Sequence, residues 1–418
     1  MTVDLGRSDR YLCVMFRVLF TVMLIATSCG AWSAQTGEIS ATHPAEYMIY
    51  QYPDVSLVVK INAPELEFDS KIYGPEGALI NSSGIPSARI GPLYQLIEAT
   101  DKARQLMIKI SPKRKADRSR INLELIQLPP GDRRSAAFAQ AYRLFSSGTE
   151  LVHVNDTTTW AMKSYTLQNA ARVFASQGWE EMQLWSEYYA AHLVLHKLND
   201  VTLALELGQE IQGSARTAGF EMIELASLIL EGDALMSAGA EVSGKLAYAR
   251  FEQAHGVWDR AVILADQLGL RSEQARALFK DGLAWEQQDQ LEEAVRQFQL
   301  ALDVSLSTDD SDLVNEIRST AATAYETQGS TSGAIEMLED IGNDLESDAG
   351  QELTDTLYEK GRILNNNYRY LEASAELEHA LGLQRSYAAT RPWGPTGLAL
   401  AWSYYSMGDG DQATGLIL

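Results

Sequence analysis

The hydrophobic and polar positions of this chain follow two different periods. From residue 44 to residue 128, apolar residues alternate with polar ones in short runs that Gly, Pro, Asn and Ser separate. This pattern predicts antiparallel strands, because alternate side chains of a strand point to opposite faces of its sheet. From residue 180 onward, apolar positions recur at helical spacing. The expected fold class is multidomain, with a small antiparallel β-sandwich followed by an all-α superhelix.

The front part contains six recognisable strands and a linker. The strands are predicted at residues 55–61, 66–73, 78–80, 93–99, 105–110 and 121–128. Six or seven short strands within about 85 residues favour a sandwich, here assigned to residues 44–128. A turn, Gly-Pro-Glu-Gly, is expected at residues 74–77, and residues 129–131, Pro-Pro-Gly, close the domain.

A basic segment, residues 109–120, lies between the last two predicted strands. It carries six Lys or Arg residues but no interleaved aromatic residue, so it does not resemble a nucleic-acid-binding patch. We expect a solvated hairpin loop. The alternative is a contact with the acidic helical part of the chain.

In the helical part, a small residue and a large residue recur together six times. The first-helix position, which is small in all but the first copy, is occupied by His192, Gly232, Gly282, Ala322, Gly361 and Ala401. The large residue three positions later is Leu195, Leu235, Trp285, Tyr325, Leu364 or Tyr404. The spacing is 40 residues, or 39 once, except for one interval of 50. A small residue where two helices touch is what a packed helical hairpin needs.

The second helix of each hairpin repeats its own pattern. Its small position is Ala204, Ala254, Ala294, Ala334, Ala373 or Ala413, and four residues later come Gly208, Trp258, Phe298, Leu338, Leu377 and Ile417. Gly239, Gly329 and Gly408 are predicted to end first helices in the left-handed conformation. The extra residues of the 50-residue interval lie between Gly239 and Ala254, so we expect an insertion confined to the turn.

These residues, especially Gly282, Ala294, Phe298 and Ala301, resemble the tetratricopeptide repeat in its longer-helix variety. The resemblance covers residues 180–418 and implies a tetratricopeptide-like superhelix. Some positions depart from the family's pattern: His192 and Gly208 in the first repeat, Arg318 where a large apolar residue is usual, and the missing closing Pro. Residues 134–178 are expected to form an irregular leading helix pair.

Charge is distributed unevenly between the two parts. The chain has 34 Lys and Arg against 56 Asp and Glu, a formal net charge of −22. Residues 30–134 hold 13 basic and 12 acidic residues, whereas residues 135–418 hold 18 basic and 42 acidic residues, a net of −24. Such an acidic part repels nucleic acid and anionic lipid. It suits a basic partner, or it serves only to keep the protein soluble.

The N-terminus has the features of an export signal. The only two cysteines, Cys13 and Cys29, lie there, so the remainder has no disulfide and no cysteine nucleophile. Three arginines precede a short apolar run at residues 18–26, and small residues follow it. This order is typical of a secretory signal peptide, which we place at residues 1–34. The alternative is a membrane anchor that stays attached.

Two cleavage positions fit this segment. Cleavage after Ala34 leaves Trp32 at a position that prefers a small side chain. Residues 26–29, Ala-Thr-Ser-Cys, resemble a bacterial lipobox with Cys29 as the lipidated residue, although Ala26 stands where Leu is usual. Lipid on Cys29 would be the only membrane contact. In both cases we expect an exported protein, periplasmic or associated with the outer membrane of a bacterium.

The order of parts also resembles a known layout. An export signal, a β domain and 40-residue repeats resemble the N-terminal portion of bacterial proteins that end in a caspase-like CHAT domain. That domain carries a His/Cys pair in the family, and no residue of this sequence matches it. The resemblance implies the alternative that this chain is the regulatory front of a longer CHAT-type peptidase. The repeat array ends within a hairpin, without a polar capping helix, which fits truncation or cover by another chain.

Other residues with catalytic or metal-binding chemistry favour structural roles. His192 and His196 stand four apart on a predicted helix, but no third ligand is evident, so we interpret them as packing residues. Residues 309–312, Asp-Asp-Ser-Asp, lack the Gly and distal Glu of a calcium loop, and Asp310 or Ser311 is expected to cap a helix. No P-loop, nucleophile elbow or dinucleotide motif appears. We therefore expect no catalysis, no metal and no cofactor.

The sequence thus predicts an exported scaffold or adaptor that binds another protein or a peptide, and no nucleic acid. A superhelix of hairpins presents its first helices on a concave face, where a peptide or a partner helix binds. From helical phase, six side chains are expected to be exposed there: Arg276, Lys280, Glu316, Arg318, Asn365 and Asn366.

Overall fold

The chain divides into two compact units, residues 1–230 and residues 231–418. The division falls within helix α6 (Glu221–Ala240). The computed structural model describes residues 33–39, 44–63, 68–84, 91–112, 119–150, 156–308, 310–344, 350–387 and 394–417.

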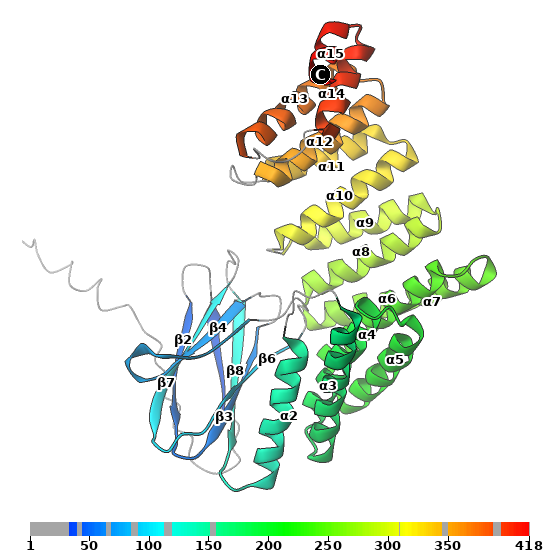
Figure 1. Cartoon of the computed structure of the whole chain (residues 1–418). Coiled ribbons are helices and arrows are strands. Elements are labelled where there is room, and N and C mark those ends of the chain that lie inside the picture. The colour runs from blue at the N-terminus through cyan, green and yellow to red at the C-terminus, as the bar shows by residue number, and fades with distance from the viewer. Residues whose placement is uncertain are drawn as a thin grey trace, which may run out of the picture. The chain divides into compact units, whose positions relative to one another are not determined.

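The first unit begins with two antiparallel sheets of four strands each (Figure 1). Their orders are β1-β8-β3-β6 and β2-β7-β4-β5. The strands are β1 (Ser33–Ile39), β2 (Ala45–Gln51), β3 (Ser56–Asn62), β4 (Phe68–Tyr73), β5 (Leu79–Gly84), β6 (Leu93–Ile97), β7 (Arg104–Pro112) and β8 (Ser119–Leu128). Side chains of both sheets form one core, in which Val59, Phe68 and Ile108 are completely buried. The predicted β-sandwich is confirmed.

Sheet membership differs from the sequence-based expectation at the basic segment. β7 and β8 flank residues 109–120, yet they belong to different sheets. The expectation of a hairpin loop is therefore wrong, because this connection crosses from one sheet to the other. Lys109 of β7 pairs with Glu46 of β2 at 3.3 Å, and residues 113–118 lie outside the described part. The predicted turn at residues 74–77 does connect a hairpin, formed by β4 and β5.

Two strands precede those expected from the sequence. β1 pairs with β8, with Ser33 opposite Leu125. β2 pairs with β7 and buries Gln51 completely, a polar residue that hides the strand's alternating pattern. The amide of Gln51 is satisfied there, since it donates to the carbonyl oxygens of Val55 and Glu98 at 2.8 and 2.9 Å.

The helices that follow the sandwich in the first unit are α2 (Arg133–Thr149), α3 (Thr157–Ser176), α4 (Glu180–His196) and α5 (Val201–Ala218). Two of them, α2 and α4, contact the sandwich directly. The hydroxyl of Tyr142 in α2 donates to the carbonyl of Tyr94 in β6. The Nζ of Lys60 in β3 lies 2.9 and 2.8 Å from the two carboxylate oxygens of Glu181 in α4. The sandwich and these helices belong to one compact unit.

The second unit continues as stacked helical hairpins (Figure 1). Its helices after α6 are α7 (Lys245–Leu268), α8 (Arg271–Gln287), α9 (Leu291–Ser305), α10 (Ser311–Gln328), α11 (Thr331–Asp344), α12 (Gly350–Asn366), α13 (Tyr370–Tyr387), α14 (Gly394–Ser406) and α15 (Gly410–Ile417). Of the six expected hairpins, α4/α5 lies in the first unit and the first helix of α6/α7 contains the division; the second unit holds α8/α9, α10/α11, α12/α13 and α14/α15. The tetratricopeptide-like arrangement is thus confirmed.

The predicted small and large residues meet inside the hairpins. A Cβ added at Gly282 would lie 2.5 Å from Cε1 of Phe298, and one added at Gly361 would lie 2.5 Å from Cγ of Leu377. Both large side chains are completely buried. A side chain at either glycine would force the two helices of the hairpin apart, so the glycines permit the close approach.

The long hairpin differs from the prediction. Gly329 and Gly408 follow their first helices with φ angles of 87° and 88°, as expected. Gly239, however, lies inside α6, and the residue with positive φ is Gly244, at 64°, directly before α7. The inserted residues lengthen the helices instead of forming a bulge in the turn: α7 has 24 residues, against 15 in α9 (Figure 1). Ala254 keeps its packing position because the added turns precede it.

Candidate functional site

Successive first helices of the second unit create the candidate site. α8, α10 and α12 place Gly282, Ala322 and Gly361 against their own second helices, and all three residues are buried. Each first helix therefore has one side fixed inward, while its other residues face solvent or the next first helix. This set of outward residues is called the first-helix face below.

An open groove lies between α10 and α12 on this face. Its volume is about 590 Å³, which is in the range of ligand sites. Leu338 and Ile341 of α11 form its floor. Its walls are Asp312, Asn315, Glu316 and Ser319 of α10 with Gln351, Glu352, Asp355, Thr356 and Glu359 of α12. The groove thus combines two apolar side chains with polar and acidic walls.

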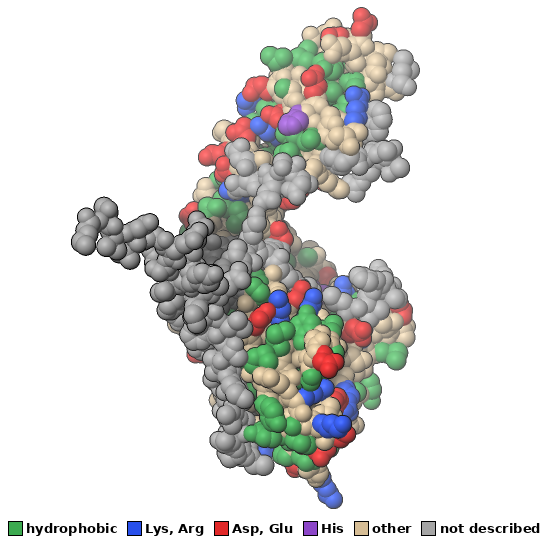
Figure 2. Space-filling view, turned by 90° about the vertical axis from the view of Figure 1, so that its left-hand side faces the viewer, with side chains coloured by type: hydrophobic (Ala, Val, Ile, Leu, Met, Phe, Trp, Pro, Cys, Tyr) green, Lys and Arg blue, Asp and Glu red, His purple; other side chains and the backbone are tan. Residues whose placement is uncertain are grey.

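Three carboxylates of the groove have no ion-pair partner among the described residues. Among its carboxylates, Glu359 pairs with Arg362 at 2.8 Å. Glu316, Glu352 and Asp355 form no ion pair with any described Lys or Arg. Glu352 accepts one long hydrogen bond, at 3.4 Å, from the amide of Asn315. On the face that Figure 2 draws, acidic side chains are scattered among apolar and basic ones.

The cations near the groove have partners of their own. Arg362 pairs with Glu326 at 2.7 Å, and Lys360 pairs with Glu339 and Glu376 at 2.8 and 2.9 Å. Burial acts to lower the pKa of Lys360, but hydrogen bonds to its two carboxylate partners outweigh this and raise the pKa. These cations remain charged at neutral pH. Arg362 also neutralises the groove carboxylate Glu359, whereas Lys360 is held by carboxylates outside the groove.

Two of the six predicted contact residues form ion pairs within the second unit. Arg276 contacts Asp310 at 2.7 Å, and Lys280 contacts Asp233 at 2.8 Å. Burial acts to lower the pKa of Lys280, but the neighbouring carboxylates, Asp233 foremost, raise it. Asp310 also caps α10, as the sequence predicted, because its carboxylate accepts from the backbone N–H of Leu313. Arg276 and Lys280 are partly exposed, and their charges are already compensated.

Arg318 and Asn365 are buried, so their expected exposure is wrong. Their exposed fractions are 6% and 7%. Arg318 occupies a position where the repeat usually has a large apolar residue, and its guanidinium lies 3.8 Å from Asp340. The amide of Asn365 donates to the carbonyl of Ala399 at 3.0 Å, and its oxygen accepts from the hydroxyl of Ser403 at 2.8 Å. Asn365 thereby joins α12 to α14.

Glu316 and Asn366 are exposed as expected, and their part in partner binding stays a prediction. Glu316 lines the groove, whereas the amide of Asn366 donates to Glu326 at 3.0 Å. The other wall residues were not among the predicted contacts, and three of them are carboxylates of α12: Glu352, Asp355 and Glu359. Their spacing of three and four residues places them on one side of a helix, which was the available signal.

A buried polar network joins α7 to α8. Nδ1 of His255 is hydrogen-bonded to Oδ1 of Asp281, and Oδ2 of Asp281 accepts from Nε1 of Trp285 at 3.2 Å. Nε2 of His255 lies 2.9 Å from the amide nitrogen of Gln288. The ring of His255 stacks on Trp285, with centroids 3.9 Å apart and planes 15° apart. Both ring nitrogens are therefore engaged, which fits a structural role.

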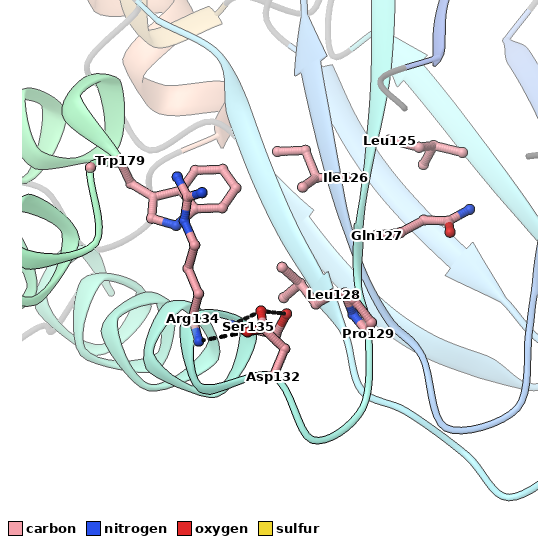
Figure 3. Close-up of a pocket in the computed structure, with 10 residues that line it drawn as sticks. Leu125, Ile126, Gln127, Leu128, Pro129, Asp132, Arg134, Ser135 and Trp179 are labelled. Carbon is pink, nitrogen blue, oxygen red and sulfur yellow. Dashed lines mark hydrogen bonds between the residues drawn. The ribbon is translucent and has the colours of Figure 1, made fainter. Parts of the chain in front are cut away.

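A second cavity, of about 340 Å³, lies in the first unit beside β8, the start of α2 and the turn before α4 (Figure 3). The carboxylate of Asp132 accepts from the backbone N–H groups of Arg134 and Ser135, at 3.3 and 2.9 Å. Hydrogen bonds from the hydroxyl and N–H of Ser135 lower the pKa of Asp132. The guanidinium of Arg134 lies 5.2 Å from the ring centroid of Trp179. The polar groups of this cavity interact with one another, so the groove between α10 and α12 is the better candidate site.

The two histidines that stand four residues apart in the sequence, His192 and His196, are neighbours on α4, with ring centroids 4.3 Å apart. In the part of the chain that the structure describes, no group of three or more His, Cys, Asp or Glu residues could hold a metal ion. None of the helices described there is long and apolar enough to span a bilayer.

Several solved structures of helical-repeat proteins are similar to this chain. The apo form of RapI matches with a TM-score of 0.41 and 10% identity, covering 66% of this chain and 94% of RapI. The apo form of the quorum sensor NprR from B. thuringiensis has a TM-score of 0.38 and 15% identity, covering 68% and 75%. A thermophilic TPR protein of Thermus thermophilus has a TM-score of 0.36 and 18% identity, covering 55% and 98%. At these low TM-scores, the likeness carries no functional argument.

No family model matches the chain, and no characterised protein matches it either.

Proposed function

We propose that this chain is a non-catalytic scaffold that binds a segment of another protein on its first-helix face. The observation that carries the proposal is the open groove between α10 and α12, with its apolar floor and polar walls. An open groove between stacked helices suits an extended or helical peptide, which gains both apolar contact and hydrogen bonds along its length.

A photo-crosslinking experiment tests this proposal. A photoreactive amino acid is placed at Ser319, an exposed residue of the groove wall, in the full chain produced in its native host. The matched control carries it at His379, an exposed residue of the second helix α13. We expect a polypeptide adduct of discrete mass at Ser319 and none at His379. No adduct at Ser319, or equal adducts at both positions, would contradict binding in the groove.

We also propose that the protein is exported and lipidated on Cys29. Residues 1–32 lie outside the described part, so the support comes from β1. Ser33 and Ala34 pair there with Leu125 and Glu124 of β8. Cleavage after Ala34 would remove two residues from this strand, whereas cleavage before Cys29 would leave the strand whole. The likeness to the front of CHAT-domain proteins stays a prediction from the order of parts.

The mature N-terminus decides between the two cleavage positions. We expect mass spectrometry of the protein from its native host to show an N-terminal peptide that begins at lipid-bearing Cys29, because this cleavage preserves β1. The variant Cys29→Ala should lose the lipid. A mature chain that begins at Gln35 would contradict the proposal.

A further inference from the structure

We infer that the groove between α10 and α12 binds a basic polypeptide segment, whose Lys or Arg side chains meet its carboxylates while apolar side chains meet Leu338 and Ile341. This inference rests on the proposed function and specifies the chemistry of the partner. The occupant is a stretch of another protein in which basic and apolar residues alternate.

The first step of the argument is the charge of the walls. Glu316 stands on α10, and Glu352 and Asp355 stand on α12, all exposed to solvent. None of the three has an ion-pair partner among the described residues. Carboxylates gathered without cations repel one another, and a cationic ligand relieves that repulsion.

The second step is that the chain's own cations do not fill this need. Arg362 and Lys360 stand on the same helix as the groove wall, yet both are held by carboxylates, Glu326 and Glu339 among them. Arg318 of α10 is buried beneath the surface. Arg362 also neutralises Glu359, and the charge of Glu316 acts on Lys280, whose ion pair is with Asp233. Glu352 and Asp355 keep their charge without a cation of the chain, so a cation for them must come from a partner.

The third step is the length of the acidic wall. Glu352, Asp355 and Glu359 extend over about 10 Å along α12, at a rise of roughly 1.5 Å per residue, and Glu359 at the far end is shared with Arg362. An extended segment advances about 3.3 Å per residue, so basic side chains two or three residues apart match this wall. Leu338 and Ile341 at the floor are 4% and 3% exposed, so they add a small apolar surface at the bottom of the groove that a small polycation would leave unused.

Other cationic or charged ligands fit the groove less well. The described carboxylates are not arranged in a group that could hold a metal ion. Nucleic acid is repelled by acidic walls, because its phosphates carry the same sign of charge. A basic polypeptide is the ligand class that satisfies both the charge of the walls and the apolar floor.

Fluorescence anisotropy with defined peptides tests the inference on the full mature chain. The probe is a labelled nonapeptide of alternating Arg and Leu, and its matched peptides carry Glu in place of Arg or Ser in place of Leu. We expect the Arg–Leu peptide to bind at least about tenfold more tightly than the Glu–Leu peptide at low salt, and more weakly as salt is added. The Arg–Ser peptide should bind more weakly than the Arg–Leu peptide.

Two triple variants locate the binding. Glu316→Gln/Glu352→Gln/Asp355→Asn removes three groove charges and should weaken the Arg–Leu peptide by about tenfold, since each exposed ion pair contributes roughly two- to threefold. The control removes three exposed carboxylates of second helices, by Glu292→Gln/Asp303→Asn/Glu336→Gln, and should change binding by less than about twofold.

Each contrary outcome has a distinct meaning. Equal weakening by both triple variants would show attraction to net charge only and would overturn the inference. Displacement of the Arg–Leu peptide by spermine at equal concentration of charge would indicate a small polycation site and would overturn it too. If no peptide binds but the Ser319 crosslink still forms, the inference of a basic ligand is overturned and the proposed function stands. Loss of the crosslink as well would overturn both.

Discussion

Replacing Gly282 by Ala should lower the free energy of unfolding of the second unit by about 1–3 kcal/mol, although Ala favours a helix by roughly 1 kcal/mol over Gly. The reason is the contact inside the α8/α9 hairpin. The new Cβ would lie 2.5 Å from Cε1 and 2.6 Å from Cδ1 of Phe298, and Phe298 is completely buried. Because the ring has no free space to enter, either the ring or the helix must move.

The chain offers a matched control for this substitution. Gly256 lies inside α7, and a Cβ added there meets nothing within 4 Å. Gly256→Ala should therefore raise stability by up to about 1 kcal/mol, through helix propensity alone. Urea unfolding followed by circular dichroism measures both variants. In a Phe298→Leu background the cost of Gly282→Ala should shrink, since the smaller side chain frees space. Equal effects of the two Ala substitutions would contradict the packing argument.

The hairpins could be predicted because their specificity is local. Gly361 and Leu377 are only 16 residues apart and meet in one hairpin, so the recurring pattern of small and large residues encodes the contact directly. The same local logic places the cap at Asp310. The sandwich could be predicted as a class because its strands alternate apolar and polar residues, a property of each strand alone.

Strand pairing could not be predicted in the same way, because it depends on residues far apart in sequence. The strands on either side of residues 109–120 are neighbours in the chain but members of different sheets. The expected exposure of Arg318 was wrong for a related reason. Helical phase shows which side of a helix a residue occupies, but the neighbouring hairpin decides whether that side is covered.

The sequence also did not predict the groove; of its wall residues, only Glu316 was among the expected contacts. Its walls come from two hairpins and its floor from a third helix, so three separate stretches must be placed before the cavity exists. The acidic spacing along α12 was visible in the sequence, but an acidic helix side normally indicates only solvent exposure. The apolar floor, Leu338 and Ile341, gives that spacing a different meaning.

Replacing Asp281 by Leu should destabilise the second unit by about 3–5 kcal/mol, because it removes one partner of the buried, hydrogen-bonded pair that Asp281 forms with His255. Asp281 and His255 are 4% and 8% exposed. Without the carboxylate, Nδ1 of His255 and Nε1 of Trp285 lose their acceptor in a largely buried environment. Asp303→Leu, a change at an exposed position of α9, is the control and should shift stability by less than about 0.5 kcal/mol.

A double-mutant cycle separates this network from simple packing. His255→Phe alone leaves the Asp281 carboxylate buried without its imidazole partner and should also be strongly destabilising. Combining His255→Phe with Asp281→Leu removes both polar groups, so the double variant should be more stable than the sum of the two single losses implies, by roughly 1–3 kcal/mol. Urea unfolding of the four proteins gives the coupling energy directly. Additive losses would mean that the two side chains act through their volume alone, whereas a large coupling would identify their hydrogen bond as the contact that holds α7 against α8.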